Sequence, residues 1–379
     1  MKKVKLGEVC EILNGFAFKS SLYVNEGIRI IRITNVQKGY IEDSDPKYYP
    51  IEYTNSIEKY ILKENDLLMS LTGNVGRVGL ISKTMLPAAL NQRVACLRTI
   101  DSLISKEYVF QFLNSDLFEQ SAIRSSNGVA QKNLSTDWLK KVEITYPSVE
   151  QQELITSTLN LIERLICCRK KQNKKFNELV KSRFNEMFIL SDFSLKRLGE
   201  LVDEVRYGTS LPATINGKYG YLRMNNITEN GKLNIQNLKH IDIPEKDLEK
   251  YVVRKGDVLF NRTNSIELVG KTCIYELDFD MVIAGYIIRI RTNNNILNPR
   301  YLSEFLNFPS TKKFLRNIAK GAVNQANINA KELQDISIPL APLSLQNEFA
   351  DFVAQVDKSQ FACQIVIKLW RNSLKSSII

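Results

Sequence analysis

Histidine is almost absent from this chain, because His240 is the only one among 379 residues. A histidine-rich metal site and a Ser-His-Asp or Cys-His mechanism are therefore disfavoured. The six cysteines show no CxxC spacing, so structural zinc is not expected and we interpret them as reduced thiols. No run of about 18 apolar residues occurs, and no apolar stretch follows the basic N-terminus. The sequence thus predicts no membrane span, no export signal and a cytoplasmic location.

What is present is the composition of a folded chain with an excess of positive charge. Apolar residues make up 44% and charged residues 25% of the sequence, a balance that disfavours disorder. The length suits two or three domains. Lys and Arg number 52 against 41 Asp and Glu, which gives a net charge of +11. That excess favours a polyanionic partner, most often a nucleic acid.

A tandem repeat organises the whole chain. Short segments recur in the same order, with an offset that drifts only from 191 to 195 residues. The segments that carry the repeat are Leu6-Gly7-Glu8 with Leu198-Gly199-Glu200, residues 31–36 with 222–227, 62–68 with 253–259, 112–114 with 305–307, 142–144 with 336–338, and Pro147, Gln151 and Glu153 with Pro342, Gln346 and Glu348. Two collinear copies predict two similar domains.

Each copy begins with a segment of mixed strand and helix patterns, so we expect an α+β fold with a curved or barrel-like sheet. In the first copy, strands are expected at 28–36, 67–71, 93–98 and 142–146, and an amphipathic helix at 106–117. The second copy repeats these elements at 220–227, 258–261, 286–291, 336–338 and 299–306. We predict globular domains over 1–149 and 190–343.

Each copy ends in a long helix, predicted over 150–189 and 344–379. Residues 150–188 contain neither Pro nor Gly, and a helix of that length would extend about 58 Å. Apolar residues follow coiled-coil steps of three, four and seven. On the first helix they are Leu154, Leu161, Leu165, Cys168, Phe176, Val180, Phe184 and Met187, and on the second Phe349, Phe352, Val356, Cys363, Val366, Trp370, Leu374 and Ile378. We expect the helices to pack on each other as an antiparallel coiled coil; alternatively, each stripe docks on its own domain.

Catalytic signatures are incomplete. Gly270-Lys271-Thr272 has the end of a P-loop, but Ser265 stands where the first glycine is needed. The segment 298–301 resembles the Asn-Pro-Pro-Tyr motif of adenine methyltransferases with Arg300 in place of the second proline, and no cofactor loop accompanies it. The sequence therefore offers no catalytic residue and no metal ligand set.

Three pairs of polar loops suit contact with nucleic acid. Glycine lets a backbone approach a phosphate, asparagine can pair with adenine, and arginine can pair with guanine. Surface turns often have the same composition without any binding role. The candidate DNA-binding residues in these loops are Gly73, Asn74, Gly76, Arg77, Asn91, Gln92, Arg93, Gln131 and Lys132 in the first copy, and Arg262, Asn264, Tyr286, Lys320, Asn324 and Gln325 in the second.

The first long helix also carries a basic run, with Lys170, Lys171, Lys174 and Lys175 at its centre. A solvated helix face explains such a run, and so does contact with DNA phosphates. A third explanation is that the run binds an acidic surface of a partner protein. We include these four lysines among the candidate DNA-binding residues.

The ordered repeat resembles the specificity (S) subunit of type I restriction–modification enzymes. The resemblance covers the whole chain and is carried by three motif pairs in order: 6–9 with 198–201, 66–68 with 257–259, and 147–153 with 342–348. It implies two target-recognition domains, each reading half of a split double-stranded DNA sequence. It also implies spacer helices that dock two methyltransferase subunits, with restriction (motor) subunits joining them.

The resemblance places catalysis in those partners, so S-adenosylmethionine, ATP and Mg are expected there and no cofactor is expected in this chain. Two alternatives belong to other classes. A self-contained DNA methyltransferase or endonuclease would need the motifs that are incomplete here. A coiled-coil scaffold without DNA affinity would not need polar loops that recur in both copies.

Overall fold

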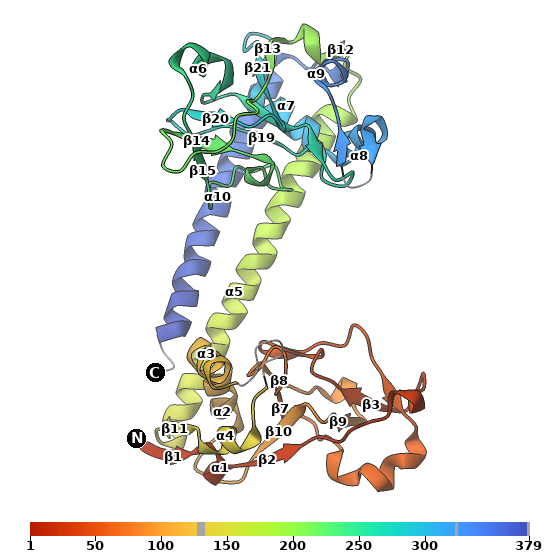
Figure 1. Cartoon of the computed structure of the whole chain (residues 1–379), viewed down its shortest axis with the longest axis vertical. Coiled ribbons are helices and arrows are strands. Elements are labelled where there is room, and N and C mark those ends of the chain that lie inside the picture. The colour runs from red at the N-terminus through yellow and green to blue at the C-terminus, as the bar shows by residue number, and fades with distance from the viewer. Residues whose placement is uncertain (127–132, 323–324, 377–379) are drawn as a thin grey trace. The chain divides into compact units, whose positions relative to one another are not determined.

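The computed structural model describes residues 1–126, 133–322 and 325–376. The chain divides into two compact units (Figure 1): Met1–Lys170 together with the chain end from Ile365, and Lys171–Gln364. The division falls within the two long helices, α5 (Val149–Phe184) and α10 (Leu343–Ser376). None of the described helices is long and apolar enough to cross a lipid bilayer.

The first unit is built on a four-stranded sheet of order β2-β10-β7-β8 and a three-stranded sheet of order β6-β3-β9. The four-stranded sheet is antiparallel, whereas β3 and β9 run parallel. A separate pair, β1 with β11, joins the start of the unit to the strand before α5. The bounds are β1 (Lys2–Lys5), β2 (Cys10–Asn14), β3 (Ile28–Ile31), β4 (Val36–Gln37), β5 (Tyr40–Ile41), β6 (Tyr48–Tyr49), β7 (Leu67–Ser70), β8 (Val78–Leu80), β9 (Ala88–Leu90), β10 (Val94–Thr99) and β11 (Glu143–Tyr146).

The second unit repeats this plan with sheets of order β13-β21-β17-β19 and β15-β14-β20-β16, and with β12 paired to β24. It adds a small sheet, β18-β23-β22, that the first unit lacks among its described residues. The bounds are β12 (Leu195–Arg197), β13 (Val202–Tyr207), β14 (Tyr219–Leu222), β15 (Lys239–Ile241), β16 (Val252–Val253), β17 (Val258–Asn261), β18 (Thr263–Asn264), β19 (Thr272–Ile274), β20 (Met281–Ile283), β21 (Ile287–Thr292), β22 (Lys320–Ala322), β23 (Gln325–Asn327) and β24 (Ser337–Pro339).

Short helices cover one face of each four-stranded sheet, and strand alternation divides the core between the two faces. Leu67 and Met69 of β7 point into the cluster shared with the helices, while Leu68 points into the cluster shared with the smaller sheet. A strand places successive side chains on opposite faces, so one strand can serve both clusters. The helices are α1 (Leu6–Val9), α2 (Lys106–Leu113), α3 (Asp116–Ser125), α4 (Thr136–Lys141), α6 (Glu245–Tyr251), α7 (Pro299–Asn307), α8 (Pro309–Ile318) and α9 (Ala330–Gln334).

These elements confirm the α+β prediction and correct one of its helices. The amphipathic pattern at 106–117 is two helices, because α2 ends at Leu113 and α3 begins at Asp116. The hydroxyl of Ser115 accepts a hydrogen bond from the amide of Phe118 at 3.2 Å, which caps the new helix. The core is also spread over several sheets instead of a single barrel-like sheet.

A buried glutamine fixes the start of each long helix to its own unit. The carboxamide oxygen of Gln152 accepts from the amide of Ser105 at 2.8 Å, and its nitrogen donates to two backbone carbonyls. Gln346 makes the same three bonds, accepting from the amide of Asn298 at 2.8 Å. The repeat therefore pairs Gln346 with Gln152 at an offset of 194, and the pairing with Gln151 was wrong.

The two long helices pack on each other within the second unit, as expected. Gln360 of α10 donates to the carboxamide oxygen of Asn177 on α5 at 2.7 Å, and Arg183 contacts Glu348 at 3.3 Å. Residue numbers rise on one helix as they fall on the other, so the pairing is antiparallel. Phe184 and Phe349 meet edge to face with ring centroids 5.3 Å apart, in the core of this unit.

The apolar seam expected on the first half of α5 was wrong. Leu154 is 68% exposed, and Leu161, Leu165 and Cys168 are exposed as well. The inward positions instead step by four and three, and half of those on α5 are polar, because the glutamine bonds set the rotation of the helix at its start. The residues facing inward on α5 are Gln152, Thr156, Leu159, Glu163, Ile166, Asn173, Asn177, Val180, Phe184 and Met187, and on α10 Gln346, Phe349, Val353, Val356, Gln360, Cys363, Ile367, Trp370 and Leu374.

Candidate nucleic-acid interface

Three polar loops meet at one end of a four-stranded sheet in each unit. The sheet is β2-β10-β7-β8 in the first unit and β13-β21-β17-β19 in the second. In the first unit β7 ends at Ser70, directly opposite the start of β10 at Val94. The amide of Leu71 donates to the carbonyl of Arg93 at 3.0 Å, and the amide of Leu134 donates to the carbonyl of Leu71 at 2.8 Å. The loops after β7, before β10 and before α4 therefore converge. These are the loops that the sequence selected.

The second unit brings the equivalent loops together with the same backbone bonds. Asn261 of β17 faces Ile287 of β21. The amide of Arg262 donates to the carbonyl of Tyr286 at 3.0 Å, and the amide of Ile328 donates to the carbonyl of Arg262 at 2.9 Å. The register thus places Leu71 and Arg262 at one equivalent position and Arg93 and Tyr286 at another.

A threonine–asparagine pair ties the loops together in both units. The hydroxyl of Thr72 donates to the side-chain oxygen of Asn133 at 3.0 Å, and Thr263 donates to Asn327 at 2.9 Å. Both threonines are buried. Our candidate residues omitted these pairs, although Thr72 and Thr263 recur at the repeat offset and could have been found from it.

In the first unit the meeting point is a polar hollow. It is lined by Leu71, Thr72, Gln92, Arg93 and Asn133. The side chains of Gln92 and Arg93 are exposed. Arginine can donate two hydrogen bonds to guanine and glutamine can pair with adenine in the major groove. The hollow therefore presents two side chains suited to base edges on a fixed backbone.

In the second unit an arginine and two tyrosines occupy the same place. The guanidinium of Arg262 lies 4.7 Å from the ring centre of Tyr207 and donates to the carbonyl of Gly285 at 3.3 Å. The hydroxyl of Tyr207 accepts from the amide of Ala330 at 2.7 Å, which fixes the ring. Tyr286 is 51% exposed. Tyr207 lies on β13, outside the predicted loops, so sequence composition did not reveal it.

Other candidate residues of the first unit contribute contacts inside the chain. A Cβ atom at Gly76 would lie 2.8 Å from that of Ala122, so this glycine allows α3 to approach the loop. Arg77 donates to the side-chain oxygen of Gln37 at 2.9 Å. Asn91 is half-buried, and its amide donates to the carbonyl of Ile31. Gly73 and Asn74 are exposed at the tip of the loop.

The remaining candidates lie in three settings. Asn264 donates to the side-chain oxygen of Asn261 at 2.9 Å, and Lys320 pairs with Glu332 at 2.6 Å, while Gln325 is exposed on β23. Gln131, Lys132 and Asn324 lie outside the described residues. The four lysines of the basic run are exposed on α5, and they are Lys170, Lys171, Lys174 and Lys175.

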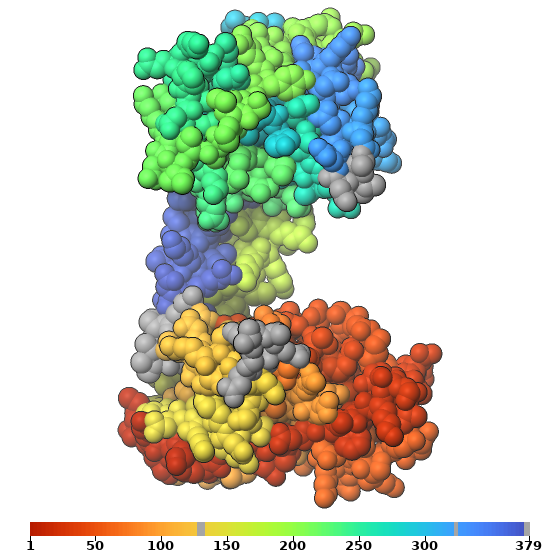
Figure 2. Space-filling model, viewed as in Figure 1, coloured from red at the N-terminus to blue at the C-terminus, as the bar shows by residue number. Residues whose placement is uncertain are grey.

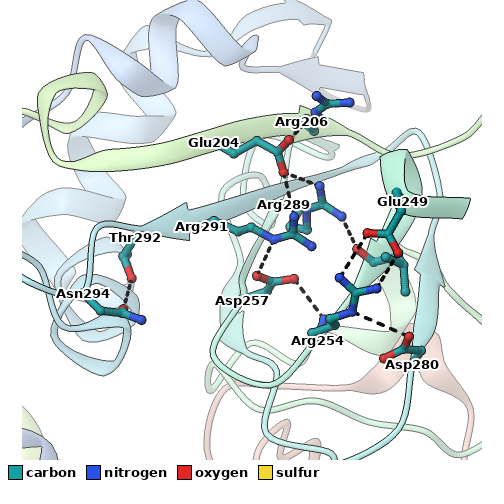
Figure 3. A network of polar contacts seen from close by, with 11 residues as sticks. Glu204, Arg206, Glu249, Arg254, Asp257, Asp280, Arg289, Arg291, Thr292 and Asn294 are labelled. Carbon is teal, nitrogen blue, oxygen red and sulfur yellow. Dashed lines mark hydrogen bonds and ion pairs between the residues drawn. The ribbon is translucent and has the colours of Figure 1, made fainter.

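The opposite end of the β13-β21-β17-β19 sheet is held by a partly buried charge network, shown in Figure 3. Arg289 is fully buried, and it donates to Glu204 and to the carbonyl of Val252. Arg291 bridges Glu204 and Asp257, at 3.2 Å from each. Burial opposes ionisation of Glu204, but the surrounding arginines lower its pKa. These ion pairs and hydrogen bonds join three strands of the sheet, so we assign the network to the frame of the domain and not to a ligand site.

The chain matches one protein family twice, over residues 1–178 and 191–365. That family is described as the type I restriction modification DNA specificity domain. A putative type I restriction enzyme specificity subunit, MjaX of Methanocaldococcus jannaschii, is 33% identical over 45% of this chain, and the match spans 40% of that relative. The EcoBI specificity subunit of Escherichia coli is 25% identical over 93% of this chain and 78% of its own length.

Solved structures show the same fold over the whole chain. A structure from work on complex assembly and conformational transition of the type I restriction–modification system has a TM-score of 0.64 at 17% identity. The S subunit of such a system from M. genitalium has a TM-score of 0.58 at 16% identity. Both matches cover 100% of this chain and 96% of the other chain.

Proposed function

This chain belongs to the type I restriction–modification DNA specificity family, and we propose that each of its two units reads one half of a split duplex target. The supporting observation is the pair of equivalent loop clusters with different side chains. Arg93 in the first cluster is replaced by Tyr286 in the second, and Leu71 is replaced by Arg262. Two loop clusters with the same backbone arrangement but different side chains are suited to two different half-sites.

The chain would act as a non-catalytic specificity subunit. Among the described residues no group of three or more His, Cys, Asp or Glu could hold a metal ion. We assign methylation to two methyltransferase subunits and cleavage to restriction subunits, with S-adenosylmethionine, ATP and Mg bound there. The purified chain should then show neither methylation nor cleavage of DNA, and turnover by the isolated chain would refute this assignment.

The experiment that tests the reading role compares one substitution in each cluster. Modified adenines are sequenced in the genome of cells that express the complex with the original chain, Arg93→Ala or Tyr286→Ala. We expect a bipartite target in which each variant relaxes one half and leaves the other intact, since a good bidentate base contact contributes about 1–3 kcal/mol of discrimination. Each variant is the control for the other. Relaxation of both halves by a single substitution would contradict independent reading.

For partner docking we propose the outward apolar positions of the long helices. Leu154, Leu161 and Leu165 of α5 and Phe361 and Leu369 of α10 are exposed. Exposed apolar side chains that gather on one surface mark sites of protein–protein contact. Co-purification with the methyltransferase subunit should fail for a Leu154→Ser, Leu161→Ser double variant. Duplex binding by that variant alone should be unchanged, which separates lost docking from lost folding.

A further inference from the structure

Three cations surround the loop between β17 and β19 in the second unit. Lys271, at the end of this loop, donates to the carbonyl of Met224 at 3.1 Å. Lys312 of α8 donates to the carbonyl of Gly270, and Arg316, one helical turn later, donates to the carbonyl of Glu267 at 3.3 Å. All three are held by backbone oxygens. Within the described part of the chain, none of them forms an ion pair.

This cluster of Lys271, Lys312 and Arg316 is only partly compensated by nearby negative charge. Burial lowers the pKa of Lys312 from 10.5 to about 7, and Arg316 and Lys271 repel its charge further. Burial also lowers the pKa of Lys271, which the carboxylate of Glu229 offsets only in part. The other nearby acid, Glu267, offers its carbonyl oxygen to the cluster. Holding three basic groups together with so little negative charge beside them disfavours their charged forms, and a bound anion would relieve this.

The first unit shows that the fold itself does not require such a cluster. The register of β7 with β8 and of β17 with β19 makes Arg77 equivalent to Lys271. Gly76 meets Ala122 of α3 just as Gly270 meets Leu315 of α8, so Glu119 occupies the position of Lys312. The carboxylate of Glu119 lies 2.6 Å from Lys38 and 3.9 Å from Arg77. In the first unit the residue at this position is an acid that balances nearby cations. In the second unit the equivalent residue is a further basic group.

We propose that Lys312 and Arg316, backed by Lys271, bind a phosphate group of the DNA backbone beside the second unit's base-reading loops. The amide of Asn261 donates to the carbonyl of Lys271 at 2.8 Å, so the end of this loop lies beside its start at Arg262. A phosphate held at the cluster would then lie close to the bases read by the loops. Helix α8 is at the surface of the unit (Figures 1 and 2), with Arg316 exposed and Lys312 half-buried. Charge-assisted hydrogen bonds to phosphate oxygens suit both side chains. This inference rests on the proposed DNA-reading function.

The decisive comparison uses two neighbouring lysines on α8. Lys312→Gln and Lys313→Gln each replace one lysine by a neutral residue, but Lys313 is exposed and outside the cluster. Binding of the full chain to a fluorescent duplex of mixed sequence is measured by anisotropy at several salt concentrations. For Lys312→Gln we expect weaker binding and a salt slope smaller by about 0.9, the value for one lost phosphate contact. For Lys313→Gln the slope should be unchanged. Equal effects of the two substitutions, or no effect of Lys312→Gln, would overturn the proposal.

A second measurement separates failure of this site from failure of the DNA-reading function. Competitive acetylation read by mass spectrometry gives the pKa of individual lysines in the full chain, with and without inorganic phosphate. We expect phosphate to raise the pKa of Lys312 and to leave that of Lys313 unchanged. If the original chain binds no duplex but phosphate shifts Lys312, the anion site stands and the DNA-reading function fails. An unshifted Lys312 removes the anion site whatever the duplex result.

Discussion

At the scale of single residues, the two buried glutamines Gln152 and Gln346 have the clearest structural role. Each carboxamide satisfies one backbone N–H and two backbone carbonyls at the junction between a globular domain and a long helix. Leaving such buried groups without partners costs about 1–3 kcal/mol.

We therefore predict that Gln152→Ala lowers the free energy of unfolding by about 1–3 kcal/mol. Its exposed neighbour provides the matched control, since Gln151→Ala should change stability by less than about 0.5 kcal/mol. Urea denaturation followed by circular dichroism measures both. Equal stabilities of the two variants would show that the three bonds of Gln152 contribute little.

Lys312 gives a prediction about pH. Its pKa is about 7 in the folded chain and near 10.5 when solvated. Between these values the unfolded chain binds the proton more tightly, so the free energy of unfolding should rise with pH across this window. Below pH 7 both states are protonated, so the pH dependence levels off while the full cost of the buried charge remains. Lys312→Gln should flatten the rise, as measured by denaturation at several pH values, and the same pH dependence in both proteins would be evidence against a depressed pKa.

How much of the site the sequence could predict depends on the distance between its parts. The three loops could be selected from the sequence because their polar composition is local and recurs in both copies, and the structure brings them together; their contact with DNA stays a prediction. The Thr72–Asn133 bond joins residues 61 apart, and the stacking of Arg262 on Tyr207 joins a loop to a distant strand. That Glu119 and Lys312 are equivalent follows only from the matching positions of α3 and α8 in the two units. These relations depend on tertiary structure, and local patterns do not contain them.

At the scale of elements, the long helices show why their existence was predictable but the rotation of α5 was not. Absence of Pro and Gly over 150–188 was sufficient to predict α5. Choosing its buried face by leucine content failed, because Gln152 and Thr156 take inward positions and Leu154 does not. Hydrogen bonds to the neighbouring domain outweigh the preference of leucine for burial at this place.

The corrected seam can be tested with two leucines five residues apart. Leu159 is 2% exposed, so Leu159→Ala should lower the free energy of unfolding by about 2–5 kcal/mol, the usual range for a buried leucine. Leu154→Ala removes the same atoms from an exposed position and should change stability by less than about 0.5 kcal/mol. Thermal unfolding of the two variants distinguishes the faces. A larger loss for Leu154→Ala would restore the seam read from the sequence.

At the scale of the whole molecule, the repeat and the antiparallel helices together suggest what sets the gap between the two half-sites of a split target. If α5 and α10 act as the spacer between the two reading units, the gap in the target depends on their length. The contacts Asn177–Gln360 and Gln172–Cys363 show which parts of the helices face each other. A change of length in one helix alone would misalign these contacts. The spacer must therefore be altered in both helices at matched positions.

We predict that removing residues 166–172 together with 363–369 shortens the unspecified gap of the target and leaves both half-sites unchanged. One heptad from each helix keeps the buried seam in register, to within about 20° of rotation. It shortens a helix by about 10 Å, which corresponds to no more than about three base pairs of duplex. Selection of binding sequences from a random duplex pool by the purified chain measures the gap. Removal of 166–172 alone is the control and should destabilise the chain, because inward positions of α5 would then face the wrong residues of α10. A doubly shortened chain that folds and selects the original gap would show that the helices do not set the spacing.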